Sequence, residues 1–541
     1  MPTISPRTKL LSALIQTLHK AVEPNTASVN NSVSSTEQDS RRNFISTAGK
    51  AALATGLLPI MEGCSKAIDF SSPSIANAPN NLSATNPKIA IIGAGIAGLH
   101  AAYLLKQKGY MANVYEASNR TGGRIMTSQQ LLGQGLYTEL GGEFIDSIHK
   151  DMLTLAKTFN LDLLDTRANN QSTLQYQAYY LNGVHYTEQQ VIDAFTPFVQ
   201  QIKSDQLNMS AVITADSHSS YDEMLDNMSI ANYFDKIGMK GWIRDLLDVA
   251  YVTEFGQPIS EQTALNFLWM ISPKITNGRF EIFGASDERY KIKGGNQQIT
   301  DKLAEQLKGQ ISLGFELTSI KQLSGNGYEL VFSTGNGQQT VSCDYLLITI
   351  PFTKLRSVAV APAWPEWKQK AIYELGYGNN SKLMLGFSKK YWYDLGYAGY
   401  FFSTNGLQSG WENSALQTPQ TGGLTVYSGG QQAIDVGNGS LESQVNKHLP
   451  LLDKMYPGAV KNYNGKSARF TWPTYKWTLC SYACFKPGQY TTIAGNEMKP
   501  VGNIFFAGEH CSYDFQGYMN GGAETGRRAA EAILTTLKSV I

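Results

Sequence analysis

The chain carries little charge, and neither sign is in excess. Charged residues make up 16% of its 541 residues, and 45 Lys and Arg stand against 44 Asp and Glu, which leaves a formal net charge of +1. A nucleic acid is held mainly by basic side chains that neutralise its phosphates. The composition therefore predicts that nucleic acid is not a partner of this protein.

Cysteine is also scarce. The five cysteines, at positions 64, 343, 480, 484 and 511, are few and odd in number, which excludes a disulfide framework. A bridge between Cys480 and Cys484 is conceivable, although nothing else in the sequence supports it. The same pair lacks a second pair of Cys or His residues at the spacing of a zinc site, so we predict no metal.

Hydrophobic residues, in contrast, are plentiful at 42%, and 11% of the residues are aromatic. Such a chain can bury a large core, which excludes a mainly disordered or collagen-like protein. Its length exceeds the roughly 100 to 200 residues of a typical domain, so we expect two intimate domains or one elaborated domain.

The N-terminal part of the chain lacks the pattern of a folded core. Residues 1–40 are polar and rich in Ser, Asn and Thr, and we expect them to be disordered. Residues 41–64 resemble a twin-arginine export signal, because Arg41 and Arg42 precede a weakly apolar stretch. An ordinary amphipathic helix is the alternative. The signal predicts an exported, periplasmic protein.

The end of this signal is left open by the sequence. Cys64 stands where the signal of a lipoprotein would end, so a lipid anchor on Cys64 is one alternative, although Glu62 is a poor match for the small residue expected there. Ala76 and Ala78 form an A-x-A cleavage site, but a proline follows it. Residues 65–87 are rich in Ser, Asn, Pro and Ala and are predicted to be a linker.

A strand, a glycine-rich turn and a helix then follow in direct succession. Residues 88–92 are strand formers, the turn has the pattern G-x-G-x-x-G, and a helical pattern covers 99–108. In this order Gly93 permits the tight turn, Gly95 lets the backbone approach a pyrophosphate, and Gly98 lets the helix pack against the strand.

The residues around this turn support a dinucleotide site. The start of the helix, at Ile96 and Ala97, offers free N–H groups and the positive end of a dipole to phosphate. A second run of strand formers, 112–115, ends in Glu116. This carboxylate lies about twenty residues beyond the glycines, where it can accept hydrogen bonds from ribose hydroxyls. The sequence therefore predicts a Rossmann-like domain in an α/β fold.

The segment from Glu116 to Arg124 resembles the E-A-x-x-R-x-G-G-R segment of the flavin amine oxidase family. The resemblance implies that the dinucleotide is FAD and that this segment wraps its pyrophosphate and ribityl chain. The further residues that it assigns to FAD here are Ala117, Arg120 and Gly123. An arginine beside two glycines can bind phosphate through two charge-assisted hydrogen bonds. A surface turn is the alternative.

Later segments resemble the same family in the same order along the chain. Residues 139–145 resemble the segment beside the isoalloxazine ring, which implies that Gly141, Gly142 and Glu143 contact the flavin. The strand at 316–320 resembles the one that presents backbone to adenine, here at Leu317.

The C-terminal segment carries the closest resemblance. It implies that Gly508 and Glu509 lie at the ribityl and pyrophosphate region. It also implies that a helix beginning near Met519 aims its positive dipole end at the flavin, where it stabilises the anionic reduced form.

Three residues match catalytic positions of the family. Tyr518 lies in a G-Y-M-x-G segment like that of the monoamine oxidases, and Tyr482 precedes a Pro-Gly pair, which implies two rings flanking the amine nitrogen. Lys382 matches the lysine that holds a water against flavin N5, and an edge-strand lysine facing solvent is the alternative. Ser481 replaces the flavin-bonded cysteine of the mammalian monoamine oxidases, which implies non-covalent FAD, although Cys480 is one position away.

The order of these blocks predicts an amine oxidase fold, in which a Rossmann-like FAD-binding domain is interleaved with an α+β substrate-binding domain. The FAD-binding segments are 88–150, 290–375 and 471–541, and the substrate-binding segments are 151–289 and 376–470. Within the latter, the hydrophobic periodicity predicts amphipathic helices over 191–212 and 230–252.

The predicted reaction is removal of a hydride from the carbon next to an amine nitrogen. The resulting imine gives an aldehyde and ammonia, and O2 is reduced to H2O2. An L-amino-acid oxidase is the main alternative, but Glu143 and Phe144 stand where an arginine for the substrate carboxylate is expected; Arg279 or Arg289 is the remaining candidate. A desaturase, a dehydrogenase that uses a quinone, and a non-enzymatic flavoprotein scaffold are further alternatives.

Overall fold

The computed structural model describes residues 87–541 apart from 168–172, 277 and 540–541. The predicted disordered N-terminus and export signal, Cys64 and all of the linker before Pro87 lie outside these residues. Residues from Pro87 to Thr535 fall within one compact unit. The boundaries of the two predicted domains stay a prediction.

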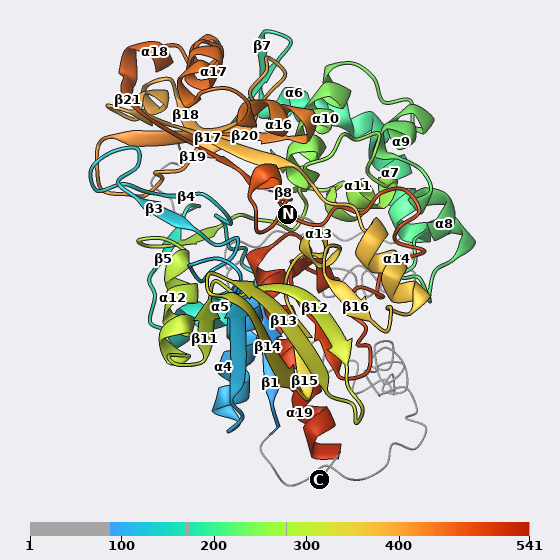
Figure 1. The fold of residues 1–541 in the computed structure, drawn as a ribbon. Coiled ribbons are helices and arrows are strands. Elements are labelled where there is room, and N and C mark those ends of the chain that lie inside the picture. Colours follow the sequence, from blue (N-terminus) through green and yellow to red (C-terminus); the bar gives the residue numbers. More distant parts are fainter. Residues whose placement is uncertain (1–86, 168–172, 277, 540–541) are drawn as a thin grey trace, which may run out of the picture. The chain divides into compact units, whose positions relative to one another are not determined.

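A five-stranded parallel sheet holds the strand of the glycine turn at its centre (Figure 1). In spatial order its strands are β11 (Ile311–Leu313), β2 (Ala112–Glu116), β1 (Ile89–Ile92), β15 (Tyr345–Ile348) and β22 (Ile504–Phe506). All residues of β1 and β15 are buried, as expected for parallel strands that are covered on both faces. This arrangement confirms the predicted α/β fold.

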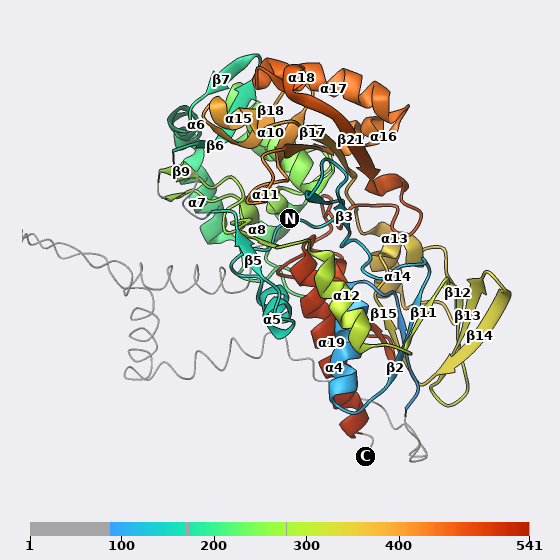
Figure 2. The same ribbon diagram turned by 90° about the vertical axis from the view of Figure 1, so that its left-hand side faces the viewer.

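Helices cover one face of this sheet and a second sheet covers the other (Figure 2). Helix α4 (Ile96–Gln107) follows β1 and packs beside α12 (Gln297–Gln306) and α19 (Met519–Ser539). The four-stranded sheet has the order β14 (Gly337–Cys343), β13 (Tyr328–Thr334), β12 (Glu316–Gln322) and β16 (Ala359–Ala361). Tyr115 of β2 stacks on Phe332 of β13 with their ring centroids 4.7 Å apart.

A seven-stranded mixed sheet is built from the middle of the chain. Its order is β21 (Tyr463–Thr471), β17 (Asn380–Phe387), β20 (Gly422–Gly429), β19 (Gln408–Glu412), β18 (Tyr397–Ser403), β6 (Gln175–Leu181) and β7 (Val184–Tyr186). Strand β17 is therefore an interior strand, and all of its residues are buried. This position excludes the alternative that Lys382 is an edge-strand lysine facing solvent.

Helices also pack on the seven-stranded sheet. Those on the side away from the five-stranded sheet are α16 (Gly430–Gly437), α17 (Leu441–Met455) and α18 (Ala459–Asn462) (Figures 1 and 2). Further helices of the described chain, whether or not they touch this sheet, are α5 (Lys150–Thr158), α8 (Ser220–Asp226), α11 (Ala264–Met270), α13 (Phe352–Leu355), α14 (Glu366–Glu374) and α15 (Tyr391–Asp394). The short strands are β3 (Thr127–Gln129), β4 (Tyr137–Glu139), β5 (Leu163–Asp165), β8 (Ile275–Thr276), β9 (Arg279–Phe280) and β10 (Tyr290–Ile292).

The two long amphipathic helices predicted from periodicity are each broken into two. The first becomes α6 (Glu188–Phe195) and α7 (Val199–Asn208), separated by a 3-10 turn that contains Pro197, because proline lacks the N–H that an α-helix interior needs. The second becomes α9 (Ile230–Lys236) and α10 (Trp242–Phe255), because Gly238 and Gly241 between them adopt positive φ angles of 71° and 72°. The prediction of single helices was wrong.

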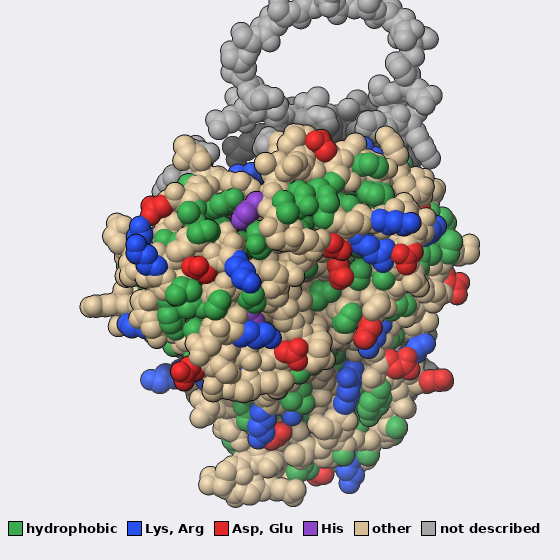
Figure 3. Space-filling model, turned by 90° about the horizontal axis from the view of Figure 1, so that it is seen from above, with side chains coloured by type: hydrophobic (Ala, Val, Ile, Leu, Met, Phe, Trp, Pro, Cys, Tyr) green, Lys and Arg blue, Asp and Glu red, His purple; other side chains and the backbone are tan. Residues whose placement is uncertain are grey.

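The distribution of surface charge and the state of the cysteines can be compared with what the composition predicts. On the face drawn in Figure 3, acidic and basic side chains are interspersed. The four cysteines in the described part of the chain are buried and unbridged, Cys480 and Cys484 included. Among the helices that the structure describes, none combines the length and the apolar character of a membrane span.

Candidate active site

One cavity gathers residues that are far apart in the sequence. Every residue that the sequence analysis assigned to FAD or to catalysis lines it, with the single exception of Gly98. A Cβ atom on Gly98 would lie 2.0 Å from the carbonyl oxygen of Gly93, so this glycine allows the close helix–strand approach that the motif predicts. The described residues contain no cluster of three or more side chains suited to a metal ion.

The turn after β1 lines the cavity. No side chain caps the start of α4, where Ile96 and Ala97 face the cavity, so the first N–H groups of this helix are available to an anion. Glu116, at the end of β2, accepts hydrogen bonds from the N–H groups of Ala94 (2.8 Å) and Ser118 (2.9 Å). The carboxylate thereby braces the turn.

Two arginines follow on the next loop. The Arg120 guanidinium donates to the carbonyl oxygens of Thr121 and Gly123, while its Nε is buried without a partner in the protein. An uncapped helix start, glycine backbone and an unsatisfied guanidinium N–H together form a donor set that fits the diphosphate of FAD.

Arg124 plays a different part, because its charge is already paired. Its Nη1 donates to Glu509 Oε1 at 2.7 Å and to the carbonyl oxygen of Ser481 at 2.8 Å. The same Glu509 carboxylate accepts hydrogen bonds from the N–H groups of Ala483 (3.3 Å) and Gly517 (2.8 Å). Ala483 follows Tyr482 and Gly517 precedes Tyr518, so Glu509 ties both tyrosine segments to the loop of Arg124.

Both predicted cage tyrosines face the cavity. The Tyr482 hydroxyl donates to the carbonyl oxygen of Glu254 at 2.5 Å and lies 3.0 Å from the hydroxyl of Tyr427. The Tyr518 ring meets the edge of the buried His149 ring at a centroid distance of 4.7 Å. Burial raises the pKa of both Tyr482 and Tyr518 well above that of a free phenol, so both rings are neutral. Their roles as a cage remain a prediction.

Lys382 is buried and fully hydrogen-bonded by the protein. Its Nζ donates to the carbonyl oxygens of Glu139 (3.0 Å) and Gly141 (2.9 Å) and to Glu143 Oε2 (2.8 Å). The predicted N5-bound water therefore requires one of these bonds to be exchanged. That role stays a prediction.

Three residues of this region belong to no motif that the sequence shows. Trp411 and Tyr427 line the cavity beside Lys382, and Tyr427 is the direct cross-strand partner of Lys382. Lys291 lies behind the cavity wall, where its Nζ donates to Glu143 Oε1 at 2.8 Å. Strand pairing brings them to the site, so no spacing in the sequence marks them.

Carboxyl groups gather near the tyrosines. Burial is the main cause that raises the pKa of Glu288 to about 8, and the nearby carboxylates of Glu254 and Asp146 raise it further. Burial also raises the pKa of Asp146 to about 7, with a smaller contribution from Asp287. Arg279 and Arg289, the two candidates for binding a substrate carboxylate, have other contacts. Arg289 forms a fork with Asp165, and the exposed Arg279 stacks over Tyr176 at 4.7 Å.

Comparison with known proteins agrees with this geometry. The profile of the family described as flavin containing amine oxidoreductase matches residues 96–534. The flavin-containing amine oxidase A of Sus scrofa is 25% identical over 84% of this chain and 86% of its own length, and the L-amino-acid oxidase of Sistrurus catenatus edwardsii is 24% identical over 87% and 92%.

Solved structures share the fold. Cyclohexylamine oxidase from Brevibacterium oxydans IH-35A superposes with a TM-score of 0.73 and 20% identity over 84% of this chain and 100% of its own. Putrescine oxidase bound to putrescine gives a TM-score of 0.71 and 19% identity over 83% and 99%. With the family profile spanning most of the chain, this FAD-dependent enzyme belongs to the family of flavin-containing amine oxidoreductases.

Proposed function

We propose that the substrate is an amine without a carboxylate group and that O2 is the electron acceptor. FAD, when bound, accepts the hydride from the carbon next to the amine nitrogen. The observation that carries the choice of amine is the charge around the tyrosines: carboxyl groups lie there, and each cation that lines the described cavity already has an acceptor in the protein.

The cations that line the described cavity each have an acceptor in the protein. Arg120 lies on the loop beside the helix start, Arg124 is paired with Glu509, Lys354 lies 3.7 Å from Glu316, and Lys382 donates to three acceptors. An amino-acid substrate would bring a carboxylate near the buried carboxyl groups of Glu254, Asp146 and Glu288, which offer it no positive charge. An amine carries the opposite charge until it loses its proton.

The two tyrosines then receive the neutral amine. Their rings are buried, neutral and electron-rich, and a slot between their two faces would hold the amine nitrogen away from water. The Tyr482 hydroxyl is held at its far end by Glu254 and Tyr427, which keeps the ring from rotating. The chain thus orients the C–H bond, and the cofactor supplies the oxidation.

A matched substrate panel tests this proposal. The enzyme is mixed anaerobically with phenethylamine and L-phenylalanine, and with tyramine and L-tyrosine, so that each pair differs only by the carboxylate. We expect the flavin to bleach faster with each amine. Faster bleaching with the amino acids would overturn the choice of amine. Admission of air should then produce one H2O2 per flavin reoxidised, and reoxidation only by a quinone would overturn O2 as acceptor.

We propose in addition that the protein is exported through the twin-arginine route. Arg41 and Arg42 followed by a weakly apolar stretch support this, since the route carries proteins that have already folded around a cofactor. Replacement of both arginines by lysine should leave the protein in the cytoplasm. Unchanged export of that variant would contradict the proposal, and labelling with a radioactive fatty acid tests a lipid on Cys64.

A further inference from the structure

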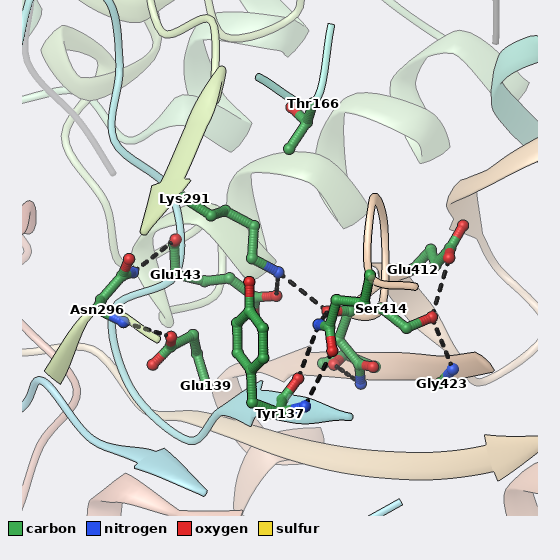
Figure 4. Close-up of polar contacts among 12 residues, drawn as sticks. Tyr137, Glu139, Glu143, Thr166, Lys291, Asn296, Glu412, Ser414 and Gly423 are labelled. Atoms are coloured by element: carbon green, nitrogen blue, oxygen red, sulfur yellow. Dashed lines mark hydrogen bonds and ion pairs between the residues drawn. The ribbon is translucent and has the colours of Figure 1, made fainter. Parts of the chain in front are cut away.

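Glu143 lies buried between two lysines. Its Oε1 accepts a hydrogen bond from Lys291 and its Oε2 accepts one from Lys382, both at 2.8 Å. The side chain of Glu143 is 1% exposed, that of Lys291 1% and that of Lys382 4%. Figure 4 shows Lys291 and Asn296 approaching Glu143 from strand β10 and the start of α12. The carboxylate therefore has one cation on each oxygen.

Hydrogen-bond counting gives the charges of this trio. The Nζ of Lys382 donates to three acceptors, which requires the three hydrogens of an ammonium group, because a neutral amine has two. Burial alone would raise the pKa of Glu143, but Lys291 and Lys382 outweigh it, and the pKa lies below its ordinary value. The proximity of Glu143 likewise outweighs burial for Lys291, whose pKa is raised. Two cations and one anion leave a net charge of +1.

The placement of the three residues differs. Glu143 and Lys382 line the cavity beside Gly141 and Gly142, whereas Lys291 does not. Lys291 is held behind the wall by Glu143 and by the carbonyl oxygen of Asn413 at 3.0 Å. Without Lys291, the wall would carry a neutral pair. With it, the charge of Lys382 is not cancelled.

We propose that Lys291 is a positioning residue that neutralises Glu143 and thereby leaves a net positive charge on the wall facing the flavin. A positive charge beside an oxidised flavin favours uptake of electrons, because reduction adds negative charge to the ring system. Lys291 acts here through Glu143 and Lys382 and needs no contact with FAD. The proposal rests on FAD binding and does not depend on which amine is the substrate.

Sulfite tests the proposal without any amine. This anion adds to oxidised flavin, and positive charge nearby stabilises the adduct. Formation of the adduct is measured as the loss of flavin absorbance. Lys291→Met should weaken sulfite binding by about tenfold or more and lower the flavin midpoint potential. Glu143→Gln should not weaken it. The double variant keeps Lys382 alone, with the same net charge as the wild type, and should restore wild-type affinity.

Two precautions isolate the charge. Glu139 is buried next to the trio, and burial raises its pKa to about 7, so measurements near pH 6 keep most of this carboxyl protonated. Lys293→Met is the matched control, because Lys293 lies two residues further on, is 66% exposed and pairs loosely with Asp162 at 3.7 Å. This control should leave sulfite affinity unchanged.

The outcomes separate an electrostatic role from a merely structural one. A structural role would make the double variant at least as defective as Lys291→Met, and that result would overturn the proposal. Sulfite affinity unaltered in Lys291→Met at full FAD content would overturn it too. If Lys291→Met does not fold, Glu143→Gln still decides, because weaker sulfite binding in that variant contradicts a net charge set by this trio.

Discussion

Glu509 offers the sharpest test of how the tyrosines are held. Its carboxylate accepts short bonds from Arg124 (2.7 Å) and Gly517 (2.8 Å) on opposite oxygens. Glu509→Gln keeps the shape, but one oxygen becomes an amide NH2 that cannot accept. One of the two short bonds is therefore lost whichever way the amide is oriented.

The loss of unfolding free energy in Glu509→Gln can be estimated from the burial of Arg124 and Glu509. Removing one partner of a buried ion pair costs about 3–5 kcal/mol. The Arg124 side chain is 22% exposed and keeps its bond to the Ser481 carbonyl oxygen, so we expect about 2–3 kcal/mol of lost unfolding free energy. Because Ala483 and Gly517 flank the two tyrosines, anaerobic flavin reduction should also slow by about tenfold to a hundredfold.

A second carboxylate on the same cavity serves as the control. Glu316 is 35% exposed and lies 3.7 Å from Lys354 and 3.6 Å from Lys476, a surface arrangement worth about 0–1 kcal/mol. Chemical unfolding and stopped-flow reduction are compared for Glu509→Gln and Glu316→Gln at equal FAD content. If the two variants are equally stable and equally fast, Glu509 does not position the tyrosines.

Three further predictions concern packing, pH and the cofactor. Gly526→Ala should destabilise the protein by about 1–3 kcal/mol despite a helix-propensity gain of about 1 kcal/mol, because its Cβ would lie 2.2 Å from the Ala97 carbonyl oxygen; Gly335→Ala, with nothing within 4 Å, should be neutral in the same unfolding assay. Burial raises the pKa of Glu288 from 4.5 to about 8, so the contribution of this group to stability is present below pH 4.5 and is lost as the pH rises through about 8. Glu288→Gln should therefore flatten the fall in the thermal midpoint between these two pH values. An unchanged slope in the variant would argue against the raised pKa. Acid precipitation should release FAD into the supernatant, whereas yellow colour in the pellet would indicate a covalent bond near Ser481.

Local order along the chain was predictable because it depends on neighbours in the sequence. The strand, turn and helix around Gly93 appear as β1 and α4, and the predicted helix at Met519 begins at that residue. The helices over 191–212 and 230–252 were predicted too long, because the hydrophobic period continues across Pro197 and across the two glycines while the backbone does not.

The amino-acid sequence by itself determined the dinucleotide-binding turn, because this follows from residue types at short spacings, and the resemblance of its motifs to a known family implied the cofactor and the residues around it. Only the tertiary structure decided that Lys382 is interior, that Glu509 joins segments around Tyr482 and Tyr518, and that Lys291 shares Glu143 with Lys382. Glu143 lies more than a hundred positions from each of the two lysines, whereas Glu509 lies 26 positions from Ala483 and 8 from Gly517. Sheet register and burial bring such residues together, and the charge of a buried group depends on every neighbour it meets there.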